Sequence, residues 1–287
     1  MSDGVGIERP QAPFGRRAAA VSARSDHGPY LSLTVRDSVG PRPLAGQFYM
    51  LQTSADWGGG DDGRPYLPRA LSFARVEQEG DALLLDFLLE DVGPGTHRIT
   101  ELDVSDELLI AGPFGNGFDL NAASWPVLVA GGIGLAPIVA LDDEIRDLDG
   151  VRAATFVGMR TNEYAEAVAH YGLEHELATE DGSGGVRGYV TELLAPLLSA
   201  DSAGSTNGAG HTVYACGPPA MLEAIRSLCA EHEVACQLAM ESGMACGFGA
   251  CFGCVVPTHD GYTRLCVDGP VLDAGKLDTA LVAGAGH

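Results

Sequence analysis

Residues 125–148, WPVLVAGGIGLAPIVALDDEIRDL, decide the fold class of the chain. The run 126–132 is continuously apolar and ends in glycines, as expected of a strand that is buried on both faces of a parallel sheet. Residues 135–148 then show the periodicity of a helix. A buried strand that passes through a glycine turn into a helix indicates an α/β domain.

The same alternation continues towards the C-terminus. Residues 153–160 are expected to form a second strand, 188–198 a helix, and 211–232 a strand, a turn and a helix. Residues 199–210 are rich in Gly and Ser and are expected to form a surface loop. Because strands and helices alternate, we expect a parallel open sheet.

The first part of the chain has a different rhythm. Short segments of alternating polar and apolar residues are separated by Gly and Pro, at 30–35, 46–53, 69–76 and 82–90. Several short strands at this spacing predict an antiparallel barrel, with residues 54–63 as a loop insertion.

These patterns together predict a multi-domain α+β chain. Its expected parts are a flexible tail (1–15), an antiparallel barrel (16–122), a parallel α/β domain (123–234) and a small cysteine-rich domain (235–287).

Composition excludes several classes of partner. The formal net charge is −22, from 17 basic and 39 acidic residues, which disfavours binding to nucleic acid or to an anionic membrane surface. No apolar run is long enough to span a bilayer, and the N-terminus lacks the apolar core of a signal peptide. We therefore expect a cytoplasmic protein whose seven cysteines stay reduced.

Four of the cysteines form a metal-binding pattern. Cys246, Cys251, Cys254 and Cys266 have the spacing C-x4-C-x2-C-x11-C, whose first three members match the start of the plant-type [2Fe–2S] run. Interleaved glycines allow backbone amides to approach the cluster sulfurs. The alternative is a structural zinc site, but zinc usually takes two C-x2-C pairs and only one is present. Disulfides are less favoured still.

Two glycine turns follow expected strands in the α/β part. Residues 130–138, AGGIGLAPI, open a helix whose free N–H groups suit a pyrophosphate, although the pattern is not the Rossmann G-x-G-x-x-G. Residues 214–222, YACGPPAML, supply a second turn at the same sheet edge, and two such turns indicate a ligand crevice. A purely structural turn and a buried core cysteine remain the alternatives.

The barrel part contains one strand with a possible phosphate ligand. Residues 67–72, LPRALS, place Arg69 three residues before Ser72, and residues 93–96, GPGT, form a glycine turn. Arg69 could pair with a phosphate, whereas the alternative is a solvated arginine on a strand face.

Three patterns now stand in one order along the chain: R-x-x-S, G-G-x-G-x-A-P and C-G-P-x-x-M. Together they resemble the ferredoxin–NADP reductase superfamily, in which an FAD-binding barrel precedes a nucleotide-binding α/β domain. The cysteine segment, MACGFGACFGCVV followed by RLCVDGPVLDAGKL, is similar to the electron-transfer subunits of type 1B dihydroorotate dehydrogenase. The resemblance covers nearly the whole chain beyond about residue 16.

This resemblance implies a role for each matching residue. FAD would be held by Arg69, Ala70, Leu71, Ser72, Gly95 and Thr96, and the NAD site would be lined by Gly132, Gly134, Cys216 and Gly217. The four cysteines would hold a [2Fe–2S] cluster. The superfamily often has Tyr or Phe where Leu71 stands, so a stacking aromatic is absent here.

The resemblance also implies a function. Electrons would pass from an FMN-containing dihydroorotate dehydrogenase catalytic subunit through the [2Fe–2S] cluster and FAD to NAD⁺, in pyrimidine biosynthesis, within a heterotetramer. A stand-alone NAD(P)H reductase for a ferredoxin, oxygenase or hydrogenase is the alternative, and a non-redox module with a zinc-bound tail is a further one. NAD is expected over NADP, because Arg160 is the one basic candidate beside the second strand and Glu163 opposes it.

Overall fold

The computed structural model describes residues 12–13, 15–58, 65–120, 125–148, 150–202 and 210–282. Most of the expected tail 1–15, residues 59–63 of the expected insertion and residues 203–209 of the expected 199–210 loop lie outside the described residues.

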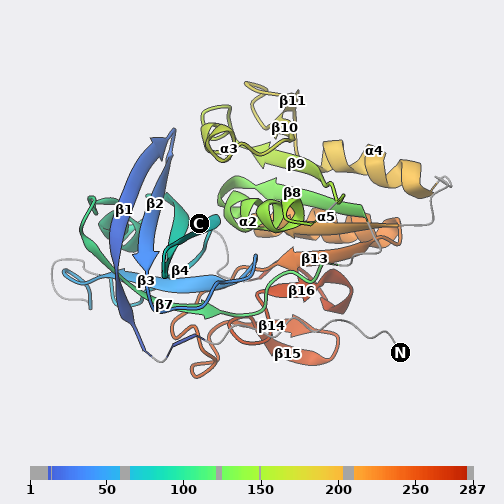
Figure 1. Cartoon of the computed structure of the whole chain (residues 1–287). Coiled ribbons are helices and arrows are strands. Elements are labelled where there is room, and N and C mark those ends of the chain that lie inside the picture. Colours follow the sequence, from blue (N-terminus) through green and yellow to red (C-terminus); the bar gives the residue numbers. More distant parts are fainter. Residues whose placement is uncertain are drawn as a thin grey trace.

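An antiparallel sheet occupies the first part of the chain, drawn in blue to teal in Figure 1. Its strand order is β4-β3-β7-β1-β2-β6-β5, and it curls until β4 contacts β6. The members are β1 (Arg17–His27), β2 (Tyr30–Asp37), β3 (Phe48–Thr53), β4 (Arg69–Ser72), β5 (Arg75–Glu79), β6 (Ala82–Glu90) and β7 (Glu107–Phe114). This confirms the antiparallel barrel that the sequence predicts.

Two local details differ from the expectation. The single strand expected at 69–76 is two strands, because the chain leaves β3 after Ser72 and pairs β5 with β6 instead. The glycine turn expected at 93–96 opens a short helix, α1 (Pro94–Thr100), with Pro94 in its first turn. Proline is favoured there because its missing N–H would have no helical acceptor.

A second, mainly parallel sheet follows, with the order β11-β10-β9-β8-β12-β13-β16. Its strands are β8 (Trp125–Gly131), β9 (Ala154–Met159), β10 (Glu176–Thr179), β11 (Val186–Arg187), β12 (His211–Cys216), β13 (Ala235–Ala239) and β16 (Val271–Asp273). The helices are α2 (Leu135–Arg146), α3 (Glu166–Tyr171), α4 (Thr191–Ser202) and α5 (Pro219–Glu231), with a 3-10 turn η1 (Gly132–Gly134). The expected parallel α/β domain is thereby confirmed.

Alternate residues of the buried strand β8 serve two different cores. Leu128 and Ala130 join a cluster that includes the barrel, α2 and α3. Val127 and Val129 join a second cluster with α4, α5 and the cysteine segment. Because successive strand residues point to opposite faces, β8 is apolar throughout, as its sequence indicated.

The cysteine segment contains a hairpin of β14 (Val255–Thr258) and β15 (Gly261–Arg264), followed by a short turn η2 (Ala274–Lys276). Figure 1 shows this segment in red, beneath both the barrel and the α/β part. Its last strand, β16, pairs with β13, which itself pairs with β12. The parallel sheet therefore extends across the expected domain boundary at residue 234.

Candidate cofactor sites

The β14–β15 hairpin brings two of the cysteines together. Cys254 directly precedes β14 and Cys266 follows β15, and the backbone N–H of Leu265 donates to the carbonyl of Cys254 at 3.1 Å. The two Sγ atoms lie 3.2 Å apart, and both side chains are buried. Burial and the neighbouring Cys254 thiol raise the pKa of Cys266 to about 12.

Cys246 and Cys251 form the second pair, in the loop that precedes the hairpin. Burial raises the pKa of Cys246, but backbone N–H groups of Cys251, Phe248 and Ala250 and the Cys251 side chain donate to its sulfur and hold that pKa at about 6. The loop can wrap around this sulfur because Gly247 and Gly249 adopt left-handed backbone angles, with φ of 78° and 89°.

This donor set fits a [2Fe–2S] cluster. Two pairs are the arrangement expected when four thiolates are shared between two irons, whereas zinc gathers its four ligands around one point. Backbone amides directed at sulfur are also typical of iron–sulfur sites. Within the described residues, no three Cys, His, Asp or Glu side chains are grouped as ligands of a single ion.

One side of the cysteine loop faces outward. Cys251 is exposed, and the neighbouring Phe248 and Phe252 are 62% and 61% exposed. Phe252 has a left-handed φ of 57°, and the guanidinium of Arg264 lies 5.3 Å from the centre of its ring. The two phenylalanines therefore form an apolar rim beside the exposed thiol rather than a cover over the whole cluster site.

Strand β4 presents the residues expected to hold FAD. All four of its residues, Arg69, Ala70, Leu71 and Ser72, are half-buried, although β4 pairs with β3. The Arg69 side chain lies against Gly95 in the first turn of α1, where a Cβ would come within 2.2 Å of its Nε atom. The Arg69 side chain occupies the place that a Cβ would take at Gly95, so only glycine lets this cation lie so close to the N–H groups of a helix start.

Two further observations concern the polar groups beside Gly95. Within the described part of the chain Arg69 forms no ion pair, and its pKa is lowered by burial. The guanidinium lies 5.8 Å from the centre of the Trp57 ring, and the buried Trp57 Nε1 has no acceptor. Apart from the bond from Arg69 to the Leu67 carbonyl at 2.7 Å, the described residues supply this cation and this buried donor with no acceptor, and both are compatible with an anionic ligand such as a pyrophosphate.

The two glycine turns of the α/β part meet at one sheet edge. Strands β8 and β12 are adjacent and parallel, with Ala130 opposite Cys216. A Cβ on Gly134 would lie 2.4 Å from the carbonyl oxygen of Cys216 and 2.6 Å from the nitrogen of Gly217. Gly132 has φ of 55° and faces Tyr30 of the barrel. The structure therefore brings Gly132, Gly134, Cys216 and Gly217 together.

Cys216 is buried at this edge, and burial raises the pKa of its thiol well above the usual value, with Glu241 contributing. The thiol is therefore neutral and acts as a small apolar surface.

Arg160 has a different partner from the one expected. Its Nη2 atom lies 3.2 Å from Glu90 Oε1 at the end of β6, and its guanidinium lies 4.6 Å from the centre of the Tyr164 ring. Tyr164 also donates to Glu90 at 3.2 Å. Glu163 instead packs against Gly28 of the barrel. Sequence reasoning missed Glu90 and Trp57, because neither belongs to a recognisable motif.

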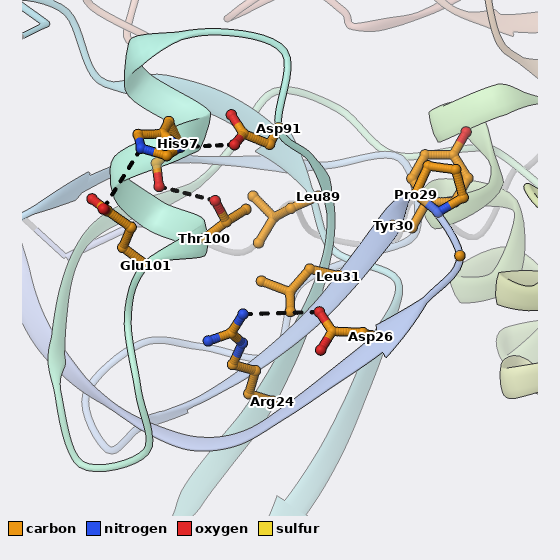
Figure 2. A pocket seen from close by; sticks show the side chains of 11 residues that line it. Arg24, Asp26, Pro29, Tyr30, Leu31, Leu89, Asp91, His97, Thr100 and Glu101 are labelled. Atoms are coloured by element: carbon orange, nitrogen blue, oxygen red, sulfur yellow. Dashed lines mark hydrogen bonds and ion pairs between the residues drawn. The ribbon is translucent and has the colours of Figure 1, made fainter.

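A separate hollow of about 380 Å³ lies between the β1–β2 hairpin, the end of β6 and α1 (Figure 2). Its charged side chains are already paired with one another: His97 with Asp91 and Glu101, and Arg24 with Asp26. None of the predicted site residues lines this hollow, although one of its walls is α1, the helix that also carries Gly95 and Thr96.

Solved structures with a similar fold show which fold this is. The NADH-dependent reduced ferredoxin–NADP oxidoreductase has a TM-score of 0.75 at 20% identity, covering 93% of this chain and 92% of that chain. The ferredoxin reductase of carbazole 1,9a-dioxygenase has a TM-score of 0.64 at 22% identity, covering 78% and 68%. The fold is that of the ferredoxin reductases, here with an iron–sulfur segment at its end.

Comparison with known sequences shows to which family the chain belongs. The iron-sulfur cluster binding domain of dihydroorotate dehydrogenase B matches residues 241–278. The electron transfer subunit of dihydroorotate dehydrogenase B (NAD(+)) from Clostridium perfringens is 35% identical, over 82% of this chain and 87% of the relative. The subunit of that name from Geobacillus sp. is 36% identical, over 74% and 80%. The chain belongs to this family of electron transfer subunits, which confirms the resemblance drawn from its motifs.

Proposed function

We propose that this chain carries electrons from a dihydroorotate-oxidising catalytic subunit to NAD⁺, using bound FAD and a [2Fe–2S] cluster. The observation that carries the proposal is the arrangement of four cysteines in two pairs beside a reductase fold. The family name of the relatives supports it, and favours it over a stand-alone reductase. When bound, FAD exchanges two electrons with the nicotinamide and single electrons with the cluster.

The residues of the chain then have separate tasks. Cys246, Cys251, Cys254 and Cys266 hold the irons, and the loop amides stabilise the negative charge on sulfur. Arg69, Gly95 and Thr96 bind the FAD pyrophosphate, while Ala70, Leu71 and Ser72 line the place of the flavin ring.

The glycine turns perform the corresponding task for NAD. Gly132 and Gly134 allow the backbone to approach the nucleotide, and Cys216 and Gly217 form the adjoining wall. Arg160 pairs with Glu90, so the cation at the end of β9 already has a partner that competes with a 2′-phosphate. This pairing supports a preference for NAD over NADP.

The partner is an FMN-containing catalytic subunit that docks over the exposed side of the cysteine loop. Exposed Phe248 and Phe252 beside Cys251 support this surface, because one-electron transfer needs close approach and aromatic residues are enriched at interfaces. We place the complex in the cytoplasm as a heterotetramer. Among the described helices, none has the length and apolar character needed to cross a membrane.

The test is co-purification with the catalytic subunit, followed by an assay of dihydroorotate-dependent NAD⁺ reduction. Cys251→Ala should lose iron and lower that activity at least 100-fold, while FAD content and NADH-driven dye reduction persist. Cys236→Ala, which removes a buried cysteine outside the loop, should retain iron and activity. A wild-type protein that contains zinc without iron, or a catalytic subunit that reduces NAD⁺ at full rate alone, would disprove the proposal.

A further inference from the structure

A hydrogen bond between two buried side chains crosses the junction between the barrel and the α/β part. Tyr171, the last residue of α3, donates its hydroxyl to Asp86 Oδ2 of strand β6 at 2.7 Å. Tyr171 is 4% exposed and Asp86 is 8% exposed. Burial, with the Asp86 carboxylate contributing, raises the pKa of Tyr171, so the phenol remains a donor.

The other oxygen of Asp86 is fixed from the barrel side. Ser32 and Thr34 of β2 donate to Oδ1 at 2.6 and 3.2 Å. In the described residues no Arg, Lys or His forms an ion pair with Asp86; three hydroxyl groups satisfy it. This carboxylate is therefore held in one orientation by donors from both sides of the junction.

A second polar contact supports the same place. Arg75 of β5 makes two hydrogen bonds to Asp143 of α2, at 2.8 and 3.1 Å. Its Nη2 atom also donates to the carbonyl of Tyr171 at 3.1 Å, and its guanidinium lies 5.6 Å from the centre of the Tyr171 ring. Tyr171 is thus fixed at its hydroxyl, its ring and its backbone.

Such a network costs stability relative to an apolar contact, because a buried carboxylate must give up water. Its benefit is direction: a hydrogen bond fixes an angle and a distance, whereas apolar surfaces can slide. A role in geometry is therefore the better explanation for a carboxylate at this position.

Strand β6 connects this network to both predicted nucleotide sites. It contacts β4, which carries Arg69 and Ser72, and it also contacts η1, which carries Gly132 and Gly134. We infer that Asp86 and Tyr171 are positioning residues that set the gap between the flavin strand β4 and the glycine turn η1. They thereby control hydride transfer between NADH and FAD. This inference rests on the proposed function.

The test uses the full-length, FAD-loaded protein and Tyr171→Phe, which removes one hydroxyl. We expect the rate constant of flavin reduction at saturating NADH to fall at least fivefold per bound FAD, with FAD affinity unchanged. Hydrogen–deuterium exchange of residues 166–171 should rise in the FAD-free protein as well. A purely structural role would change the melting temperature but leave the rate per bound FAD unaltered.

Tyr49→Phe is the matched control. Tyr49 is fully buried inside the barrel, and its hydroxyl has no hydrogen-bond partner among the residues that the structure describes, so this variant makes the same chemical change without breaking such a bond. Asp86→Asn keeps the shape of the acceptor and should also slow the reduction; combined with Tyr171→Phe, the loss should not exceed the larger single loss. The inference fails if the rate constant of flavin reduction in Tyr171→Phe falls less than fivefold, or if Tyr49→Phe lowers it equally. Failure of wild-type FAD to accept hydride from NADH would instead overturn the proposed function.

Discussion

The two junctions of this molecule differ in what accompanies their apolar contact. The barrel and the α/β part share one apolar core, and buried or half-buried polar contacts cross it as well: Tyr171 with Asp86, Arg75 with Asp143, and Glu144 with the backbone N–H of Ala45 at 2.7 Å. We call this the polar junction. The cysteine segment joins the α/β part through a second apolar core and through the pairing of β16 with β13, and we call this the apolar junction. Directional bonds fix the distance and angle of a contact, which apolar side chains alone leave freer.

The apolar junction should be the more costly one to damage. Leu265 is fully buried in the core shared with α5 and the parallel sheet. Leu265→Ala should lower the free energy of unfolding by about 3 kcal/mol, because it removes buried methyl groups and leaves a cavity. Urea unfolding of the two proteins measures the difference. Leu281→Ala changes a leucine that is 57% exposed and should change stability by less than about 0.5 kcal/mol; equal losses would show that the segment is not joined to the core.

A group of hydrogen bonds to Glu223, at the edge of the apolar junction, should make the free energy of unfolding depend on pH in the acid range. Glu223 of α5 accepts hydrogen bonds from Arg226, from the Thr279 hydroxyl and from the Ala280 N–H. The bond from Arg226, against the effect of burial, lowers the pKa of Glu223 from 4.5 to about 2. The charged form is therefore favoured in the folded state, so its contribution is complete above pH 4.5 and is lost as pH falls towards 2.

That contribution is on the order of 2 kcal/mol after allowance for partial exposure. It is measured as the difference in unfolding free energy between wild type and Glu223→Gln across this pH range. We expect the difference to shrink as the pH falls; a difference that stays constant would show that Glu223 does not titrate with a lowered pKa.

The ion pair of the polar junction should have the smallest effect on stability. Arg75→Gln breaks a two-bond contact with Asp143 whose side chains are 30% and 35% exposed, and should cost about 1 kcal/mol. Arg36→Gln breaks a more exposed pair with Glu79 and should cost less than about 0.5 kcal/mol. Thermal unfolding measures both losses. If Arg36→Gln costs more stability than Arg75→Gln, the ion pair at the junction is no stronger than an ordinary surface pair.

Local patterns predicted most of the fold. Residues 82–90 are the strand β6 with the expected bounds, and the buried strand, glycine turn and helix within 125–148 are β8, η1 and α2. Strand β1 was missed because residues 17–23 are mostly alanine, which has little preference for strands; pairing with β2 and β7 imposes the conformation.

The features of the candidate sites that have a local sequence pattern could likewise be predicted, and those that depend on distant residues could not. The cysteine spacing predicted a ligand set because all four members lie within one short segment, and the two glycine turns end adjacent strands. The contacts between Asp86 and Tyr171, or between Arg69 and Gly95, join residues far apart along the chain and have no local signature. The roles of individual FAD and NAD residues, and the domain bounds, stay predictions.

The pairing of β13 with β16 has a consequence for the iron–sulfur site when it loses its iron. Ala239 lies opposite Val271, and the N–H of Met240 donates to the carbonyl of Pro270 at 2.9 Å, so the cysteine loop leaves and re-enters one sheet at neighbouring points. The closed ends limit how far the four thiols can separate when the irons depart. We therefore expect that a chain which has lost its iron keeps these thiols near one another, so that the segment does not need to refold before iron and sulfide bind again.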